Sequence, residues 1–355
     1  DLVIPEDVSE IKSYAFPGGS CITSVTIPES VTSIGSSAFS GCSGLTSVSI
    51  PNSVTTIGDD AFYGCSSLKE LTIEDGEETL SLGYNWEDNN GLFYDSPLET
   101  VYLGRNLSYS TNSSDGYSPF CNTPIKELTI GNSVTSIGSY AFYNCSRIVS
   151  VKIGSGVLSI DTNAFSSTNL KKVVWLPNTP PEGYENVSSA RNYVSNDSYN
   201  GLDNVTVYPY LSSMFEAGGL KYVPVSPSER TCDAIDCFYN NAAENIAIGK
   251  TVNYRGIEMT LLDVKDYVCY GNDSIKTLQI KEYAGNIGEN SFYDCDNLKT
   301  VNIQNLEGNI GESSFDGCSN LETVNISDMI GNIGDKAFYD CAGLKGIGIP
   351  NTVAG

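Results

Sequence analysis

The sequence predicts a repeat solenoid, in which short units stack on one another along a single axis. The first observation is a Phe-x-x-Cys-x-x-Leu heptad, which runs over 39–45 and returns over 62–68 and 292–298. The second is its period, because the key phenylalanine recurs after 23 residues at the steps 16→39, 39→62, 142→165, 292→315 and 315→338. A unit this short cannot bury its own apolar face, so it must stack on its neighbours.

Each unit is expected to begin with a short strand. The pattern Leu45-x-x-Val48-x-Ile50 alternates apolar and polar positions, and strands one period apart would pair in parallel. The remaining apolar residues of the unit would then point inward along a return path that turns too often to be one long helix. Gly58 marks a sharp bend in this path. We expect a left-handed backbone there, because glycine adopts it without a Cβ penalty. The glycines at the same phase are Gly35, Gly138, Gly288, Gly311 and Gly334.

The period divides the chain into three segments: a first array over 1–176, a cap or junction over 177–245, and a second array over 246–355. In the first array the spacing stretches where polar residues are inserted, at Glu74–Asn90 and Ser108–Ser118. Insertions in solenoids loop out on one face, and that face is often used for binding.

The irregular middle of the chain carries its own local signals. A strand is expected over Asn204–Tyr208 and a short helix over Tyr210–Gly218, where the glycine would end it. The second array would open with a hairpin over Thr251–Leu262, with Gly256 in the turn. Cys269 then takes the place of the key phenylalanine, 23 residues before the next one.

Composition excludes several classes of function. Asp and Glu number 43 against 19 Lys and Arg, so the formal net charge is −24. Such a field repels phosphate backbones, which argues against nucleic acid as a partner. The chain has no histidine, the usual general base and a common transition-metal ligand. We therefore expect no enzymatic activity, no cofactor and no metal site.

The surface is expected to be an exported one. Only 17% of residues are charged, which leaves Ser, Thr, Asn and Gly to solvate much of the surface, as in many extracellular bacterial proteins. No run approaches the roughly 20 apolar residues of a membrane span, so no insertion of this chain into a membrane is expected. The chain begins in mid-pattern at Leu2–Pro5, which predicts a trimmed piece of a longer exported protein.

Most of the eleven cysteines should be reduced core residues. Six share one phase and form an inward ladder: Cys42, Cys65, Cys145, Cys295, Cys318 and Cys341. Rungs of a parallel stack lie about 4.8 Å apart with side chains pointing the same way, which does not suit a disulfide. A metal site is disfavoured because the ladder is linear. Cys232 and Cys237 lie outside the ladder, and either a small disulfide or two free thiols is compatible with their spacing.

The stretch from Ile50 to Leu68, Ile-Pro-Asn-Ser-Val-Thr-Thr-Ile-Gly-Asp-Asp-Ala-Phe-Tyr-Gly-Cys-Ser-Ser-Leu, closely resembles the BspA-like class of leucine-rich repeats. The resemblance covers 1–176 and 246–355, and the segment around 205–223 looks like the terminal cap common in that family. It implies a right-handed coil with a parallel β-sheet on the concave side. It also implies display on a bacterial cell surface and, for some members, adhesion to host matrix proteins or other cells. The family supplies no catalytic residues.

The outward positions of the predicted strands are the better candidates for binding. They are short and polar, which suits hydrogen bonding along a broad partner rather than gripping a small molecule. A solvated sheet face with no partner is the competing interpretation. The candidates are Glu70, Thr72, Thr100, Tyr102, Glu127, Thr129 and Lys152 in the first array and Gln279, Asn302 and Asn325 in the second.

The tyrosine-rich junction offers a second possible surface. Tyr184, Tyr193 and Tyr199 could stack on sugars or dock a protein, since tyrosine couples apolar area to a hydrogen-bonding tip. Ordinary packing within a cap is the alternative. The acidic runs Glu74–Glu78 and Glu87–Asn90 could hold calcium, but a solvated insertion explains them as well.

Together these features predict a non-catalytic, adhesin-like binding protein, secreted or on the surface of a bacterium. Its partner would be a host matrix protein or another cell-surface protein, bound through the concave sheet and the inserted loops. Two alternatives stay open: a carbohydrate-binding module that uses the junction tyrosines, and a passive stalk that presents another domain.

Overall fold

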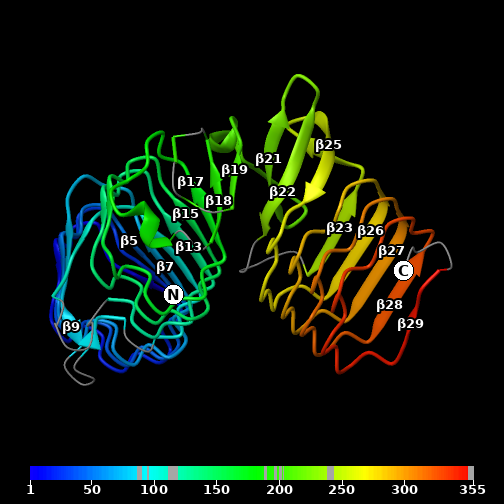
Figure 1. Ribbon diagram of the computed structural model, residues 1–355. Coiled ribbons are helices and arrows are strands. Elements are labelled where there is room, and N and C mark those ends of the chain that lie inside the picture. Colours follow the sequence, from blue (N-terminus) through cyan, green and yellow to red (C-terminus); the bar gives the residue numbers. More distant parts are fainter. Residues whose placement is uncertain are drawn as a thin grey trace. The chain divides into compact units, whose positions relative to one another are not determined.

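The computed structural model describes residues 1–85, 90–93, 96–110, 119–187, 190–195, 198–199, 202, 204–237 and 244–350. The chain forms two compact units, Asp1–Val207 (unit 1) and Tyr208–Gly355 (unit 2) (Figure 1). Each unit is a β-solenoid with a parallel sheet along one side. Helix in the described residues is limited to two 3-10 turns, η1 (Tyr184–Val187) and η2 (Leu211–Ser213).

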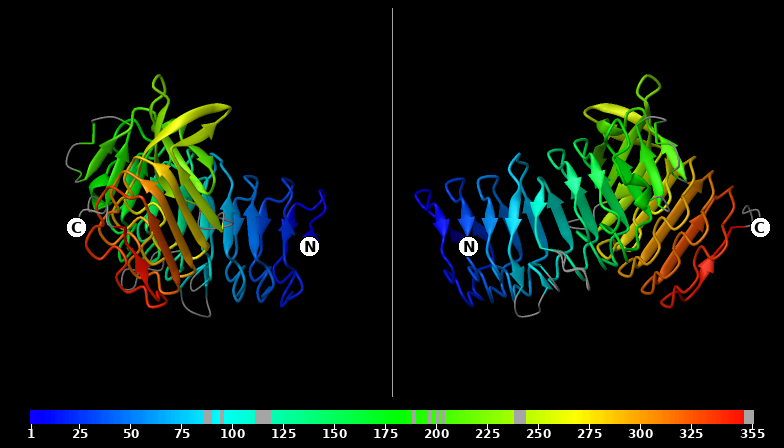
Figure 2. Two further views of the ribbon diagram at one scale, coloured as in Figure 1. Left: turned by 90° about the vertical axis from the view of Figure 1, so that its right-hand side faces the viewer. Right: turned by 60° about the vertical axis from the view of Figure 1, so that its left-hand side comes forward.

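Unit 1 is organised around an eight-stranded parallel sheet, in which strands one turn apart lie side by side (Figure 2). The register joins equivalent positions of successive repeats, as in Val48↔Leu71 and Val101↔Leu128. This confirms the prediction of parallel strands paired one period apart. In spatial order the strands are β19 (Val205–Val207), β18 (Arg191–Val194), β17 (Lys172–Trp175), β15 (Ser150–Ile153), β13 (Glu127–Ile130), β11 (Thr100–Leu103), β7 (Glu70–Ile73) and β5 (Ser47–Ile50). Beyond β5, the strands β1 (Leu2–Val3) and β3 (Val25–Thr26) pair in parallel.

The return path of unit 1 forms a second stack of very short parallel strands, which the sequence analysis does not anticipate. Their apolar member is the residue that precedes the phase glycine, such as Ile34 or Ile57. The strands are β2 (Glu10–Ile11), β4 (Ser33–Ile34), β6 (Thr56–Ile57), β8 (Leu80–Leu82) and β12 (Leu107–Ser108), with β14 (Ser136–Ile137) and β16 (Ser159–Ile160) as a separate pair. Two or three residues per strand are too few to produce a recognisable alternation in the sequence.

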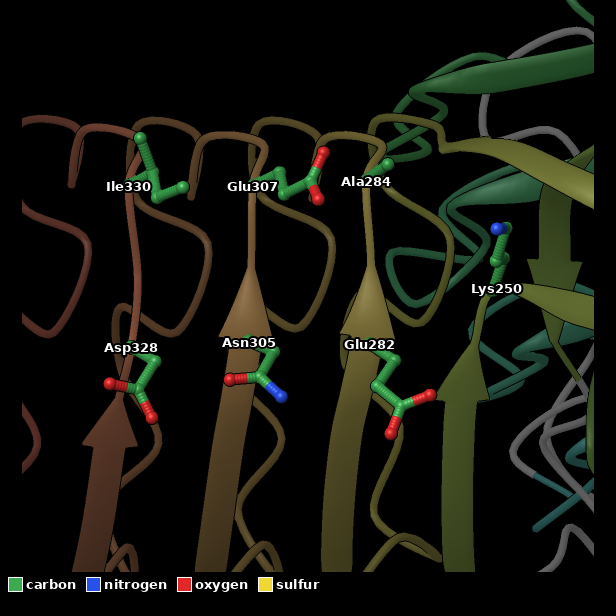
Figure 3. Close-up of a pocket in the computed structure, with 7 residues that line it drawn as sticks. All are labelled: Lys250, Glu282, Ala284, Asn305, Glu307, Asp328 and Ile330. Atoms are coloured by element: carbon green, nitrogen blue, oxygen red, sulfur yellow. The ribbon is translucent and has the colours of Figure 1, made fainter.

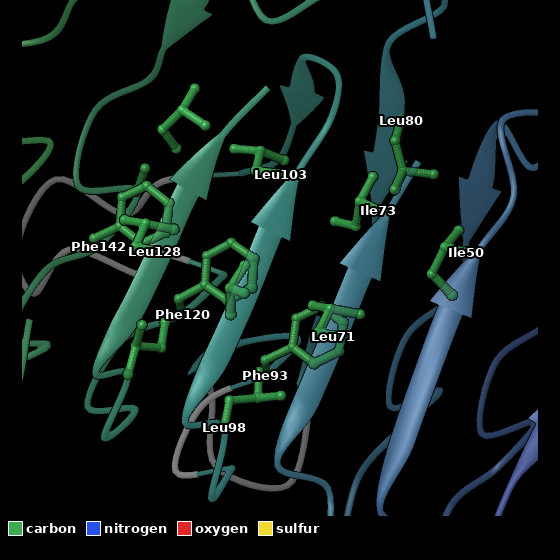
Figure 4. Close-up of a cluster of buried hydrophobic side chains, with 14 of the residues drawn as sticks. Ile50, Leu71, Ile73, Leu80, Phe93, Leu98, Leu103, Phe120, Leu128 and Phe142 are labelled. Carbon is green, nitrogen blue, oxygen red and sulfur yellow. The ribbon is translucent and has the colours of Figure 1, made fainter. Parts of the chain in front are cut away.

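The core lies between these two stacks and is threaded by the phenylalanines. Ring centroids on neighbouring turns of unit 1 are 5.3 to 5.6 Å apart, and the rings are nearly parallel. Figure 4 shows Phe93, Phe120 and Phe142 in one row beside the leucines and isoleucines of the sheet. Phe292, Phe315 and Phe338 of unit 2 stack in the same way, at 5.3 and 5.1 Å.

The phased cysteines line the same core as free thiols. Each Sγ donates to the main-chain carbonyl of the previous turn, as Cys65 does to Phe39 (3.3 Å) and Cys318 to Phe292 (3.1 Å). Burial raises the pKa of the Cys65 thiol to about 12, so this sulfur stays protonated at neutral pH. The thiols therefore act as small apolar rungs that also satisfy a carbonyl.

Cys232 and Cys237 are free as well, which excludes the disulfide alternative in this structure. Both lie on one strand, β22 (Thr231–Cys237). Five steps along an extended strand cover about 16 Å, far beyond the Cα separation that a disulfide allows.

The expected left-handed backbone at the phase glycines is wrong. Gly35 and Gly58 are not left-handed; instead, a Cβ on them would meet Ser13 N at 2.4 Å and Ser36 N at 2.5 Å, respectively. Glycine is needed there because the backbones of successive turns approach closely. Left-handed residues lie two positions before and after the phenylalanine, as at Asp60 (φ 55°) and Gly64 (φ 69°).

The insertions of unit 1 are partly built into the coil. Within Glu74–Asn90, β8 extends the return-side stack, and β9 (Tyr84–Asn85) pairs antiparallel with β10 (Asn90–Gly91). Residues 86–89, which include most of the second acidic run considered for calcium (Glu87–Asn90), lie outside the described residues, as do 111–118 of the second insertion. Buried Arg105 donates to Pro51 O (2.8 Å) and Asn52 O (2.7 Å), two turns away, and thereby clamps the base of the first insertion.

The junction differs in detail from its sequence reading. The strand over Asn204–Tyr208 is confirmed as β19, but the helix over Tyr210–Gly218 is wrong: η2 is followed by β20 (Phe215–Ala217). The parallel sheet of unit 1 continues past residue 176 into β18 and β19. The three-segment division into 1–176, 177–245 and 246–355 stays a prediction beside the two compact units described here.

Unit 2 begins with a five-stranded sheet and continues as a solenoid. The first sheet has the order β20, β21 (Leu220–Ser226), β22, β25 (Ile257–Val264), β24 (Thr251–Tyr254). Strands β24 and β25 form the predicted hairpin, with Gly256 left-handed in its turn. The second sheet is parallel, in the order β23 (Asn245–Gly249), β26 (Thr277–Tyr283), β27 (Thr300–Leu306), β28 (Thr323–Ser327), β29 (Ile347–Gly348). Cys269 occupies the phenylalanine place: its N–H donates to Ser291 O as Phe39 N–H donates to Ala61 O.

Candidate functional site

The predicted strand residues of unit 1, as distinct from its junction tyrosines, all lie on the outward face of the eight-stranded sheet and are half-buried. The parallel register sorts them into two rows that cross the strands. One row contains Glu70, Thr100 and Glu127, and the other contains Thr72, Tyr102, Thr129 and Lys152. We call these outward positions, in each unit, the sheet face.

Some of these side chains are already engaged by the fold. The Tyr102 hydroxyl donates to Asp75 Oδ2 (2.8 Å) in the base of the first insertion. Burial and the nearby Asp75 carboxylate raise the pKa of Tyr102 to about 12, so it stays a neutral donor. Thr100 Oγ1 is buried and has no hydrogen-bond partner in the described part of the chain. The sheet face of unit 1 is therefore a mixture of structural and unengaged polar groups.

The junction tyrosines are less accessible than a stacking site requires. Tyr193 and Tyr199 are only 2% and 4% exposed, and Tyr199 donates its hydroxyl to Pro177 O (2.9 Å). Tyr184 is half-buried and packs edge-on against Trp175 and Tyr199. Two of the three rings thus belong to the core, which is the cap-packing alternative rather than the sugar-stacking one.

In unit 2 the predicted residues again lie on the sheet face. Asn325 Nδ2 donates to Asn302 Oδ1 (2.7 Å), so these two amides form part of a polar ladder across β27 and β28. Gln279 is exposed on the neighbouring strand β26. The structure thus brings the three residues into one row, as the alternation predicts, but two of them satisfy each other.

A hollow that the sequence analysis missed lies at the carboxyl end of these strands. It has a volume of about 580 Å³ and is lined by two rows of residues (Figure 3). One row is Lys250, Glu282, Asn305 and Asp328; the other is Ala284, Glu307 and Ile330. We call it the corner pocket, because these residues belong to the corner between the sheet strand and the return path.

The corner pocket exists because the chain leaves the strand differently in unit 2. The residue two positions after the sheet isoleucine is left-handed on three successive turns: Glu282 (φ 51°), Asn305 (φ 54°) and Asp328 (φ 53°). The residue after it is fully buried on each turn, and the next one points outward. The buried residues are Tyr283, Leu306 and Met329, and the outward ones are Ala284, Glu307 and Ile330. Asn and Asp tolerate a positive φ, but the Glu at 282 gives no such signal in the sequence.

The polar side chains of the corner pocket are not used by the fold. Glu282, Asn305, Glu307 and Asp328 are exposed. Within the described residues, their side chains have no hydrogen-bond or ion-pair partner. Ile330 is 67% exposed, which is high for a large apolar side chain. A hollow with unengaged charges and an exposed apolar wall is suited to binding rather than to support.

In the part of the chain that the structure describes, no group of histidine, cysteine, aspartate and glutamate side chains converges as metal ligands do. None of the helices among the described residues is long and apolar enough to cross a membrane.

The chain is similar to known repeat proteins. A leucine rich cell surface protein from Faecalibacterium prausnitzii is 21% identical, over 99% of this chain and 82% of that one, with a TM-score of 0.37. A leucine-rich repeat protein from Bacteroides ovatus is 19% identical, over 99% and 87%, with a TM-score of 0.33. At TM-scores this low, neither likeness carries an argument about function. Among curated proteins none matches this chain.

The family model gives the decisive comparison. The model of the BspA type leucine rich repeat region matches in six copies over residues 1–114, 113–193 and 234–355. These ranges contain the phased phenylalanines, the cysteine ladder and most of the parallel strands described above, though not β19. They cover most of the chain, so the resemblance noted in its sequence is confirmed. The chain belongs to the BspA type leucine rich repeat family.

Proposed function

We propose that this chain is a non-catalytic binding protein, secreted or displayed on a bacterial cell surface, that engages a protein partner through its sheet faces. The observation that carries the proposal is the pair of rows of polar side chains that the parallel register aligns across the sheet face of unit 1. The residues that the solenoid core needs are buried, whereas these residues recur in phase but point outward.

The parallel sheet of each unit supports a broad contact rather than a chemical transformation. A parallel sheet presents rows of side chains spaced about 4.8 Å apart over many turns, which suits recognition of an extended surface. The absence of histidine from the sequence removes the usual proton-transfer partner of a nucleophile. Family membership adds support for surface display.

The test is direct binding to a panel of purified extracellular matrix proteins, measured by surface plasmon resonance at physiological salt. The variant Glu70→Lys/Glu127→Lys reverses two charges on the sheet face of unit 1. The matched control Glu6→Lys/Glu185→Lys reverses two exposed charges away from that face. We expect at least one matrix protein to bind, and the sheet-face variant to weaken binding more than the control does.

Absence of binding to the whole panel would contradict the adhesin-like function. Equal weakening by both variants would show that net charge, rather than the sheet face, governs the contact.

A further inference from the structure

We propose that the corner pocket of unit 2 receives a lysine or arginine side chain from an extended basic segment of a partner protein. This inference rests on the proposed binding function and names the chemistry of the partner. It starts from the two rows of side chains shown in Figure 3.

The charges of the pocket select a cationic occupant. Glu282, Glu307 and Asp328 contribute three negative charges and Lys250 one positive charge, which leaves a formal charge of −2. None of the three carboxylates has an ion-pair partner within the described residues. Lys250 lies at one end of its row, beside Glu282, because Ile248 pairs with Ile280 in the register. The other end of the row, at Asp328, is the more negative one.

The apolar wall suits the stem of a long basic side chain. Ile330 is 67% exposed beside Asp328, and Ala284 lies on the opposite side of Glu307. Lysine and arginine lay their methylene groups along apolar surface while the charged end reaches polar groups. The volume of about 580 Å³ is within the range of ordinary ligand pockets, so a side chain together with some of its backbone fits.

The spacing of the carboxylates argues against a single metal ion as occupant. Glu282 and Asp328 lie on strands two steps apart, a backbone separation of about 10 Å. Oxygen ligands of calcium lie about 2.3–2.6 Å from the ion, and no group of carboxylates among the described residues converges in this way. In a polyproline II segment, which has three residues per turn, residues three positions apart lie on the same side and span about 9 Å. Basic residues at this spacing would match the two outer carboxylates.

The experiment titrates the whole protein with a peptide in which every third residue is lysine and the others are serine and glycine. Isothermal titration calorimetry is run at low salt and at physiological salt. A peptide with glutamate in place of lysine is the ligand control. We expect the lysine peptide to bind, with affinity that falls as salt rises, and the glutamate peptide not to bind.

The protein variant is Glu282→Gln/Glu307→Gln/Asp328→Asn. Its matched control, Glu289→Gln/Glu312→Gln/Asp335→Asn, makes the same charge change on the same three turns, away from the pocket. Both sets are solvent-exposed, and circular dichroism and the thermal midpoint check that both variants fold. We expect the pocket variant to weaken the lysine peptide by about tenfold and the control by about twofold or less.

Equal weakening by the two variants would overturn the proposal, because attraction by net charge alone would explain it. No binding of the lysine peptide at either salt would overturn it too. If a matrix protein binds and the pocket variant leaves that affinity unchanged, the pocket proposal fails while the proposed function stands. If no matrix protein binds, the proposed function fails, and the peptide titration still decides the chemistry of the pocket.

Discussion

The corners of the two units use the same number of residues and expose different ones. The sheet isoleucine and the return isoleucine are seven residues apart in both, as in Ile50→Ile57 and Ile280→Ile287. In unit 1 the fourth residue after the sheet isoleucine is buried, in Val31, Val54, Val134 and Val157. In unit 2 the third is buried, and a left-handed residue precedes it. One backbone conformation per turn therefore creates a new outward row without changing the period.

The two units also satisfy the corner backbone differently. In unit 2 an asparagine recurs before the return isoleucine and forms a ladder: Asn309 N and Nδ2 donate to Asn286 Oδ1, and Asn332 N donates to Asn309 Oδ1. Asp263 begins the ladder by accepting from Asn286 N and Nδ2. Unit 1 has a threonine or serine at this phase, such as Thr56, except in its first turn, which has Glu10. The apolar ladders are thus common to both units, whereas the polar ladder belongs to unit 2.

The shared phenylalanine stack should give equal and large effects in the two units. We expect Phe62→Ala and Phe315→Ala each to destabilise its own unit by about 3–5 kcal/mol, because each leaves a cavity in a packed row. Hydrogen exchange read separately over 1–207 and 208–355, with the thermal midpoint, measures this. An unchanged midpoint would contradict the core assignment, and a large effect in one unit alone would break the comparison.

The buried corner residue is the third after the sheet isoleucine in unit 2 and the fourth in unit 1. Alanine substitutions at these two positions should therefore have opposite effects on stability in the two units. Leu306→Ala should cost about 2–4 kcal/mol, whereas Glu307→Ala should stay within about 0.5 kcal/mol. In unit 1 the order reverses: Val134→Ala should cost about 2 kcal/mol and Ser133→Ala little. Denaturant unfolding of the four variants measures this. A destabilising Glu307→Ala would show that the corner of unit 2 is not built as described.

The asparagine ladder should matter in unit 2 only. Asn309→Ala removes a donor and an acceptor that link three turns, so a loss of about 1–2 kcal/mol is expected. Thr56→Ala, at the same phase of unit 1, serves as the control and should stay within about 0.5 kcal/mol. Comparable losses in both would show that the residue type at this phase is unimportant. The readout is hydrogen exchange of the amides at Asn309 and Asn332.

The smallest expected effects are opposite responses to acid. Burial acts to raise the pKa of Glu99 in unit 1, but Lys69 (2.7 Å) and Lys126 (3.6 Å) outweigh it and lower the pKa below the ordinary 4.5. Its contribution is present above pH 4.5 and is lost as pH falls through the lower folded value. Burial and neighbouring carboxylates, among them Asp296 and Asp316, raise the pKa of Asp294 in unit 2 above the ordinary 3.8. The stability of unit 2 therefore rises as pH falls through the raised pKa that Asp294 has in the folded state, because the carboxyl becomes neutral there.

Urea unfolding between pH 3 and 7 tests the acid response. Glu99→Gln should flatten the acid loss in unit 1. Asp294→Asn should raise the stability of unit 2 at pH 7 and remove its gain on acidification. Identical pH profiles for the parent and both variants would contradict these assignments.

Much of the fold follows from the sequence because the residues that recur with the 23-residue period are apolar and must be buried in the core. The phenylalanines and cysteines are apolar and in phase, and the hairpin carries a glycine at its turn. The phase glycines show the limit of this reasoning. The sequence correctly indicates that only glycine fits at these positions. The reason is close contact with the backbone of the previous turn, which one repeat taken alone does not show. The helix expected over Tyr210–Gly218 fails for a similar reason, since pairing of β20 with β21 decides that segment.

The sequence alone predicts only part of the candidate site. The alternation along the strands places Gln279, Asn302 and Asn325 on the sheet face, and the structure agrees. It does not reveal that Asn302 and Asn325 bond to each other, nor that Tyr193 and Tyr199 are buried. A signal for the corner pocket was present: Gly-Asn-Ile-Gly recurs at 285–288, 308–311 and 331–334, and marks the turns with the altered corner.

The sequence by itself determines the solenoid, its period, the parallel pairing and the residues of the core, because each repeat states the same apolar pattern. Only the tertiary structure decides which polar residues stay free. That depends on contacts between turns: whether a neighbouring amide accepts a hydrogen bond, how closely two backbones approach, and whether one residue per corner is left-handed. At Glu282 a left-handed backbone places a residue that the sequence presents as ordinary surface in the wall of a pocket.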